Sequence, residues 1–203
     1  KRESECRSAA RTEAPTARKL LVRAAMSNPV VVRTTQGAIR GFELPSGQRV
    51  FRGIPYAEPP VGDLRWSPPV PKAAWNTTLD ASAFGHTCLQ NPGSSWATVQ
   101  GLDNMSEDCL FLNVVAPPAE SAARAPSPVL VYIHAGEFHY GSGADRESDM
   151  PYFAPDAVLV TINYRIGIFG FLASEDLRSR SVRGGTGNYG VQDQRLALRW
   201  VRH

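Results

Sequence analysis

Two uninterrupted runs of apolar, mostly β-branched residues limit what this chain can fold into. The first is Val129–Ile133, and the second, residues 157–162, follows about 25 residues later. A strand with one face in water alternates apolar and polar residues, whereas a strand covered on both faces reads as a continuous apolar run. We therefore predict two buried strands of a sheet covered by helices, the arrangement of the α/β class.

Shorter strand signals precede these two runs. Residues 30–32, 39–44 and 50–54 are strand-like segments separated by tight turns at Gln36-Gly37 and at residues 45–47. Three short strands joined by tight turns predict a small antiparallel β-meander.

Irregular structure is expected in two segments between the predicted strands. Residues 55–71 hold six prolines, so neither a helix nor a central strand can persist there. Packing of Tyr56 and Trp66 is expected to order this segment. Residues 110–115 are a further strand candidate, and the Pro-, Ala- and Ser-rich residues 117–128 read as an exposed linker.

Helical periodicity begins near Asn188 and predicts an amphipathic helix that is still continuing at His203. The side chains that recur at helical spacing are Val191, Gln194, Ala197, Leu198 and Val201. A helix that continues to the last residue is expected where the chain holds only part of a domain.

Charge is unevenly distributed along the chain. The formal net charge is +3, but seven of the 22 basic and three of the 19 acidic residues lie in residues 1–26. The remainder holds 15 basic and 16 acidic residues, so no basic surface for nucleic acid is expected. We interpret residues 1–27 as a disordered arm and residues 28–203 as the domain. A transit-like peptide, or sequence upstream of a start at Met26, is the alternative for the first residues. No run of about 18 apolar residues occurs, so no membrane span is predicted.

The cysteines leave the redox state open. Cys88 and Cys109 would close a loop of about 20 residues, worth roughly 3 kcal/mol if they are bonded, or they are two reduced thiols. Two sequons, at Asn76 and Asn104, favour a secreted or ER-lumenal location, although no signal peptide is recognisable.

The residues that follow the first apolar run are the candidate site. The sequence HAGEFHYGSG at positions 134–143 places small residues directly after a predicted sheet strand. Such a turn can bring backbone N–H groups close to a ligand oxygen, as in an oxyanion hole. The alternative is a glycine-containing loop that only reverses the chain.

Five segments, in order, resemble the type-B carboxylesterases and cholinesterases. They are QG with IRG at 36–41, FRGIPYA with PP, G and LRW at 51–66, SEDCLFLNV at 106–114, TINYR with G and FGFL at 161–172, and GNYG with DQ at 187–194. The resemblance implies the N-terminal portion of an α/β-hydrolase fold. A small antiparallel β-meander would precede the first strands and helices of the main mixed sheet, and the chain would end before the nucleophile elbow.

The resemblance also implies a chemistry. The parent protein would be a serine esterase that hydrolyses small-molecule carboxylic esters through an acyl-enzyme, without metal or organic cofactor. The oxyanion hole would use the backbone N–H groups of Gly136 and Glu137, with Ala135 as a third position. No G-x-S-x-G occurs in the chain, so the triad Ser, acid and His are expected elsewhere in the parent. Ser142 is expected to be a loop serine.

The family pattern at this loop has three consecutive glycines, and here Ala135 and Glu137 replace the first and third. A carboxylate about 4 Å from a developing oxyanion would cost about 4 kcal/mol at an effective dielectric of 20, or about a thousandfold in rate. That penalty depends on where the Glu137 side chain points.

Other residues match structural positions of the family. Cys88 and Cys109 occupy the positions of its first disulfide, and Asn163, Arg165, Asp193 and Gln194 match a buried polar scaffold. Of the four histidines, His86, His139 and His203 are expected to be packing or surface residues, and His134 is excepted because it belongs to the loop motif.

Two other functions remain open at this stage. Some cholinesterase-like proteins act as non-catalytic binding or adhesion proteins, and the altered loop favours such a role. The chain could also be an inactive, incomplete gene product.

Overall fold

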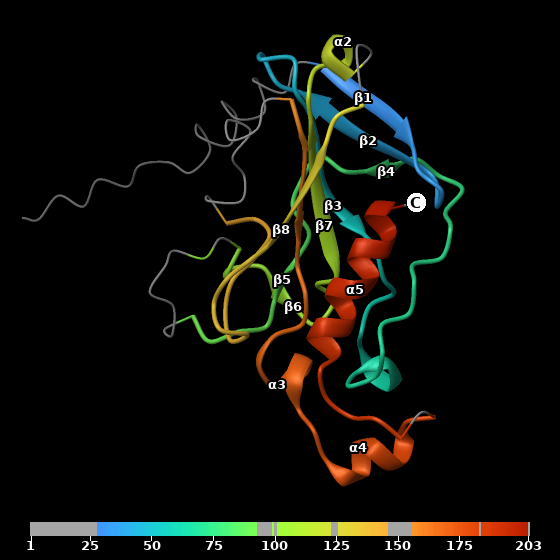
Figure 1. The fold of residues 1–203 in the computed structure, drawn as a ribbon, viewed down its shortest axis with the longest axis vertical. Helices are drawn as coiled ribbons and strands as arrows, with labels where there is room; N and C mark the ends of the chain where they lie inside the picture. The colour runs from blue at the N-terminus through green and yellow to red at the C-terminus, as the bar shows by residue number, and fades with distance from the viewer. Residues whose placement is uncertain are drawn as a thin grey trace, which may run out of the picture.

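A mixed sheet organises the part of the chain that the computed structural model describes, residues 28–92, 99, 101–122, 126–145, 156–182 and 184–202. The arm predicted over residues 1–27 lies outside these residues. In the described residues the sheet runs in the order β1-β2-β3-β7-β9-β8, with β4 paired to β2 (Figure 1). The strands are β1 (Asn28–Arg33), β2 (Ala38–Glu43), β3 (Arg49–Pro55), β4 (Leu79–Asp80), β7 (Phe111–Ala116), β8 (Val129–Ile133) and β9 (Val158–Ile162).

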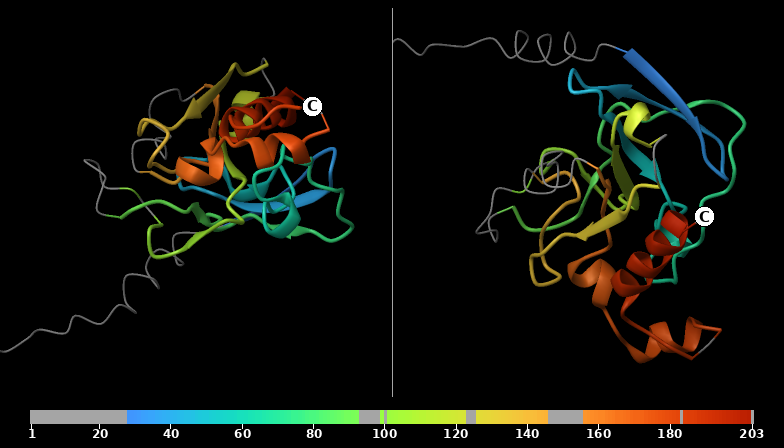
Figure 2. Two further views of the ribbon diagram at one scale, coloured as in Figure 1. Left: turned by 90° about the horizontal axis from the view of Figure 1, so that it is seen from below. Right: turned by 45° about the horizontal axis from the view of Figure 1, so that its top comes forward.

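The predicted meander is confirmed. β1, β2 and β3 pair antiparallel in sequence order, and Figure 2 shows β1 and β2 together at one end of the sheet. The β2–β3 turn is closed by a hydrogen bond from Gly47 N–H to the carbonyl of Leu44, at 2.8 Å. Gly47 has a φ of +82°, a left-handed conformation that glycine adopts without a Cβ clash.

The central strands β3 and β7 pair antiparallel, and β7 also pairs antiparallel with β9. β8 pairs parallel with β9. The sheet is therefore mixed, as expected. The main hydrophobic core includes strand side chains of β2, β3, β7 and β9 together with Ala197, and Figure 1 shows the helix that carries Ala197 along one face of the sheet.

The expectation that Val129–Ile133 is buried on both faces is wrong. Within the described residues β8 pairs only with β9 and lies at the edge of the sheet. Val129 and Leu130 are 52% and 51% exposed, whereas Val160 of β9 is 3% exposed. The helix that carries Ala197 packs against β9, so it leaves the faces of β8 largely uncovered.

The exposed linker expected at residues 117–128 is also wrong in part. Pro117 is fully buried, and its carbonyl accepts hydrogen bonds from Nε and Nη2 of Arg49 at 3.2 and 3.1 Å. A short helix, α2 (Ala119–Ala122), follows it. The guanidinium of Arg49 therefore fixes the end of β7 to the start of β3.

The proline-rich segment is largely irregular, as predicted. Its regular parts are the end of β3 at Pro55, a β-bridge between Ala57 and Pro71, and the 3-10 turn η1 (Gly62–Leu64). Its two predicted anchors are in place. Tyr56 is 1% exposed and its hydroxyl donates to the carbonyl of Asn163 at 2.7 Å. Trp66 stacks on Phe169 at a centroid distance of 6.5 Å and donates from Nε1 to the carbonyl of Ile168 at 3.0 Å.

Three helices follow β9: α3 (Gly167–Phe171), α4 (Glu175–Arg180) and α5 (Tyr189–Arg202). The helix expected after Asn188 is thus confirmed, but its buried face differs from the predicted one. The buried residues are Tyr189, Gly190, Asp193 and Ala197, while Val191 and Leu198 are 38% and 44% exposed. The ion pair that Asp193 makes fixes which face of α5 turns inward. No helix in the described residues is long and apolar enough to cross a membrane.

Candidate active site

A left-handed turn follows β8 directly. Gly136, Glu137 and Phe138 have φ angles of +113°, +53° and +64°. The carbonyl of Gly136 closes the turn by accepting from the N–H groups of His139 and Tyr140 at 2.8 and 3.2 Å. The carbonyl of Phe138 accepts from Gly167 N–H at 2.6 Å, so the turn is tied to the first residue of α3.

The three positions of the glycine motif tolerate side chains differently. A Cβ on Gly136 would lie 2.0 Å from the carbonyl oxygen of Tyr140, so only glycine fits there. Glu137 occupies a left-handed conformation that disfavours residues with a Cβ by roughly 1–2 kcal/mol. Ala135 is not among the residues with positive φ, so alanine is compatible with its backbone.

The backbone N–H groups of Ala135, Gly136 and Glu137 donate to no acceptor in the part of the chain that the structure describes. Gly136 is buried, and Ala135 and Glu137 are exposed. Successive unpaired backbone N–H groups in a turn of this kind can bind a negatively charged oxygen.

A hollow of about 920 Å³ lies beside this turn. It is lined by Leu89, Gln90, Asn91, Glu137, His139, Tyr140, Gly167, Ile168 and Phe169. Among the described residues of this lining, Glu137 contributes the only carboxylate, and it forms no ion pair with any of them. Of the three predicted positions, only Glu137 lines the hollow.

His134 supports the turn from below. It is 3% exposed and stacks on Tyr164 with ring centroids 4.3 Å apart. Burial lowers the pKa of His134 to about 4, so the ring is neutral at pH 7. Its Nδ1 lies 2.9 Å from the carbonyl of Ala135, and because a carbonyl only accepts, the proton is on Nδ1. His134, which the sequence assigns to the loop motif, is therefore a neutral ring packed against Tyr164.

Tyr164 links this support to the sheet. Its hydroxyl donates to the carbonyl of His134 at 3.2 Å, and burial raises the pKa of Tyr164 to about 12. Phe138 packs edge-on against the same ring at 6.4 Å and against Phe171 of α3 at 4.8 Å. The turn is thus held by Tyr164, which follows β9, and by Phe171 of α3.

The far end of the loop is fixed by four polar side chains. Gly141 exchanges two hydrogen bonds with the amide of Gln90, at 2.8 and 3.0 Å. Gly143 N–H donates to Oδ1 of Asn163 at 2.7 Å. The carbonyl of Gly143 accepts from Asn113 and from Thr161, at 3.2 and 2.7 Å. These bonds hold the chain path after the turn.

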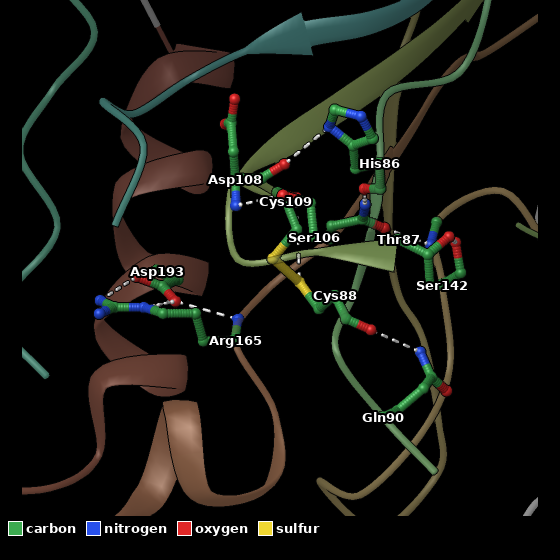
Figure 3. Close-up of a disulfide and its surroundings, with 12 residues drawn as sticks. His86, Thr87, Cys88, Gln90, Ser106, Asp108, Cys109, Ser142, Arg165 and Asp193 are labelled. Carbon is green, nitrogen blue, oxygen red and sulfur yellow. Dashed lines mark hydrogen bonds and ion pairs between the residues drawn. A yellow bond between two sulfur atoms is a disulfide. The ribbon is translucent and has the colours of Figure 1, made fainter. Parts of the chain in front are cut away.

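Ser142 is a structural serine. It is 1% exposed, its Oγ accepts from Ala144 N–H at 3.0 Å, and it lies 3.4 Å from Oγ1 of Thr87 (Figure 3). No histidine is bonded to it in the described residues. It therefore lacks the base that a nucleophilic serine requires.

Cys88 and Cys109 are joined in a disulfide, with Cα atoms 5.0 Å apart (Figure 3). The bond lies between β5 (Thr87–Cys88) and the residues after β6 (Met105–Ser106). Gln90, which holds Gly141, is two residues from Cys88, so the disulfide also steadies the support of the loop.

We expect the double substitution Cys88→Ser/Cys109→Ser to lower the free energy of unfolding by about 3 kcal/mol, because it opens a loop closed over 21 residues. Thermal unfolding of the full-length protein with and without dithiothreitol measures this. Reductant should destabilise the wild type and leave the double variant unchanged. Equal midpoints for the oxidised wild type and the variant would contradict the expectation.

A buried ion pair joins the segment after β9 to α5. Arg165 and Asp193 are 3% and 0% exposed in their side chains. Asp193 accepts from Nε, Nη2 and the backbone N–H of Arg165 at 2.8, 2.8 and 3.0 Å (Figure 3). Burial raises the pKa of Asp193, and these three hydrogen bonds oppose that rise. The predicted structural role of this pair fits its geometry.

Sequence reasoning missed Gln90, Asn113 and Tyr164 as supports of the site. Asn113 carried a usable signal, because it is a single amide inside an otherwise apolar strand. A buried amide in such a strand needs hydrogen-bond partners, which indicates that it fixes a neighbouring segment of the chain. Gln90 and Tyr164 carried no comparable signal, since their partners come from distant segments.

Comparison with known proteins places these observations in a family. The sequence profile of the "Carboxylesterase family" matches residues 28–203. Fumonisin B1 esterase of Sphingopyxis macrogoltabida is 41% identical over 193 residues, covering 90% of this chain and 33% of that protein. Para-nitrobenzyl esterase of Bacillus subtilis is 38% identical, covering 85% of this chain and 34% of that protein.

The solved structure of juvenile hormone esterase from Manduca sexta superposes with a TM-score of 0.73 at 34% identity, covering 86% of this chain and 32% of that one. This chain spans about a third of the length of these relatives. The described residues have the architecture of the N-terminal portion of an α/β-hydrolase fold, and the chain belongs to the carboxylesterase family.

Proposed function

We propose that the protein containing this chain is a serine esterase that hydrolyses small-molecule carboxylic esters through an acyl-enzyme. Membership of the carboxylesterase family supports this, as do relatives named fumonisin B1 esterase and para-nitrobenzyl esterase. The structure of the related juvenile hormone esterase has OTFP covalently attached, which fits a covalent mechanism in the family.

The observation that carries the proposal is that the N–H groups of Gly136 and Glu137, in a turn beside an open hollow, have no acceptor among the described residues. In the proposed mechanism these groups stabilise the negative charge on the ester oxygen when the nucleophile attacks. Removing one such donor typically costs about 10²- to 10³-fold in kcat. The donors are on the backbone, so the replacement of glycine at positions 135 and 137 leaves them available.

We propose that the nucleophilic serine lies outside residues 1–203. These residues contain no G-x-S-x-G, and Ser142 is buried and bonded to no histidine among the described residues. We expect the full-length protein to hydrolyse p-nitrophenyl acetate and to be blocked by one equivalent of an organophosphate. Residues 1–203 alone should give neither turnover nor labelling. Labelling of a serine within residues 1–203 would mean that the nucleophile lies in this chain and that its proposed position elsewhere in the protein is wrong.

A second candidate function is a non-catalytic binding protein of the same fold. The observation that favours it is the exposed Glu137 carboxylate, which lines the hollow at the position of a family glycine. About 4 Å from a developing oxyanion, such a charge opposes catalysis by about 4 kcal/mol.

The substitution Glu137→Gly separates the two candidates. If the protein is an esterase, the substitution removes both the charge and the left-handed strain, and kcat/KM for p-nitrophenyl acetate should rise by about 10- to 1000-fold. Glu137→Gln is the matched control, because it removes the charge and keeps the strain. Absence of turnover in the wild type and both variants would support the binding protein.

A further inference from the structure

A second hollow, of about 520 Å³, lies on another part of the surface. It is bounded by residues 66–71, by the end of α4 and by the outer side of α5. Figure 1 shows these three parts together: α4 lies at the lower end of α5, and the segment around η1 runs alongside. No residue lines both this groove and the hollow beside Glu137.

Among the residues that the structure describes, three guanidinium groups and no carboxylate line the groove. Arg180 comes from the last turn of α4, and Arg195 and Arg199 lie one turn apart on α5. All three are exposed and have no hydrogen-bond or ion-pair partner among the described residues. The neighbouring Arg178 behaves differently, because it pairs with Glu175 at 3.1 Å and is not in the groove.

The start of α5 adds to this positive character. Tyr189 and Gln192, in the first turns of this 14-residue helix, line the groove, and the first turn holds no acidic residue. A helix N-terminus carries about half a positive charge and favours a nearby anion. It therefore reinforces the three guanidinium groups.

The opposite wall is apolar. Trp66, Pro68, Pro69 and Pro71 line it, and Trp66 is held in place by its stacking on Phe169 and its bond to Ile168. A wall of fixed aromatic and proline side chains suits a hydrocarbon or aromatic body. A volume of this size accommodates a small organic ligand.

We propose that this groove is a second ligand site, which binds an organic anion with a carboxylate or phosphate head and an apolar body. The planar guanidinium groups of Arg195 and Arg199 pair with the oxygens of the head group. The apolar body lies against Trp66 and the prolines. This site is independent of the proposed esterase chemistry, because it shares no residue with the oxyanion turn.

Isothermal titration calorimetry on the full-length protein tests the site with octanoate and octyl phosphate as probes. Octanol and octyltrimethylammonium are the neutral and cationic comparators. We expect the anions to bind at least about tenfold more tightly than the comparators, and less tightly as salt is added. The tighter of the two anions identifies the preferred head group. Equal affinity for octanol and octanoate would overturn the proposal.

The double substitution Arg195→Gln/Arg199→Gln should raise the Kd of the preferred anion by about tenfold or more. Arg178→Gln, on an exposed arginine outside the groove, is the matched control and should leave that Kd unchanged. Arg180→Gln is a second variant on a different helix, and circular dichroism checks that each variant folds. An unchanged Kd in folded Arg195→Gln/Arg199→Gln and Arg180→Gln variants would refute the site, whether or not the protein hydrolyses esters.

Discussion

The substitution Gly136→Ala should lower kcat/KM of the full-length protein for p-nitrophenyl acetate by at least about 100-fold. The added Cβ would lie 2.0 Å from the carbonyl oxygen of Tyr140, and that oxygen is backbone, so the turn itself must move. In the proposed oxyanion hole, a displaced turn would no longer hold the N–H groups of Gly136 and Glu137 against the same oxygen. Loss of one donor of this kind costs about 10²- to 10³-fold.

The matched control for this prediction is Ala135→Gly. Ala135 lacks a positive φ, so glycine there changes neither the turn nor its donors. Steady-state kinetics with p-nitrophenyl acetate should therefore give kcat/KM values close to those of the wild type. If Gly136→Ala folds normally and retains wild-type kcat/KM, the turn does not form the oxyanion hole.

The substitution Asp193→Asn should destabilise the full-length protein by about 3–5 kcal/mol. Arg165 is 3% exposed in its side chain, and its guanidinium would lose a carboxylate that now accepts three hydrogen bonds. A buried charge without its partner is strongly unfavourable. Thermal unfolding followed by circular dichroism should show a clearly lower midpoint than for the wild type.

The control for Asp193→Asn is Glu175→Gln, which removes an ion pair of similar composition on the surface. Glu175 is 85% exposed in its side chain and pairs with Arg178 within one turn of α4. Exposed pairs of this kind contribute at most about 1 kcal/mol, so the midpoint should hardly change. Equal midpoints for the two variants would show that the buried pair adds no stability.

Local patterns predicted most of the elements but not their environment. The turn residues around Gly47 and the periodicity after Asn188 act over a few residues, so β1 to β3 and α5 could be expected from the sequence. The apolar run Val129–Ile133 was read as doubly buried and is an edge strand in the described residues. An apolar composition shows that a strand can be buried, but it does not specify whether the strand lies at the centre or at the edge of the sheet.

The sequence motif predicted where the candidate site lies, but not its backbone conformation or the exposure of its side chains. The positions of Ala135, Gly136 and Glu137 follow from the family resemblance. The left-handed turn depends on Gly167, which bonds Phe138 from the next helix, and the exposure of Glu137 follows from that turn. Contacts between segments so far apart have no local signature, so the direction of the carboxylate could not be predicted.

The supports of the loop also determine when it acquires its shape during folding. Gly141 and Gly143 are held by Gln90, Asn113, Thr161 and Asn163, across sequence separations of 51, 30, 18 and 20 residues. Contacts between distant residues require large loops to close first, and they form slowly. Asn113 of β7 and Thr161 of β9 are register partners and both bind the carbonyl of Gly143, so we expect the glycine loop to become ordered only after these two strands have paired. Protection of the Gly141 and Gly143 N–H groups from hydrogen exchange during folding would then report when the sheet has assembled.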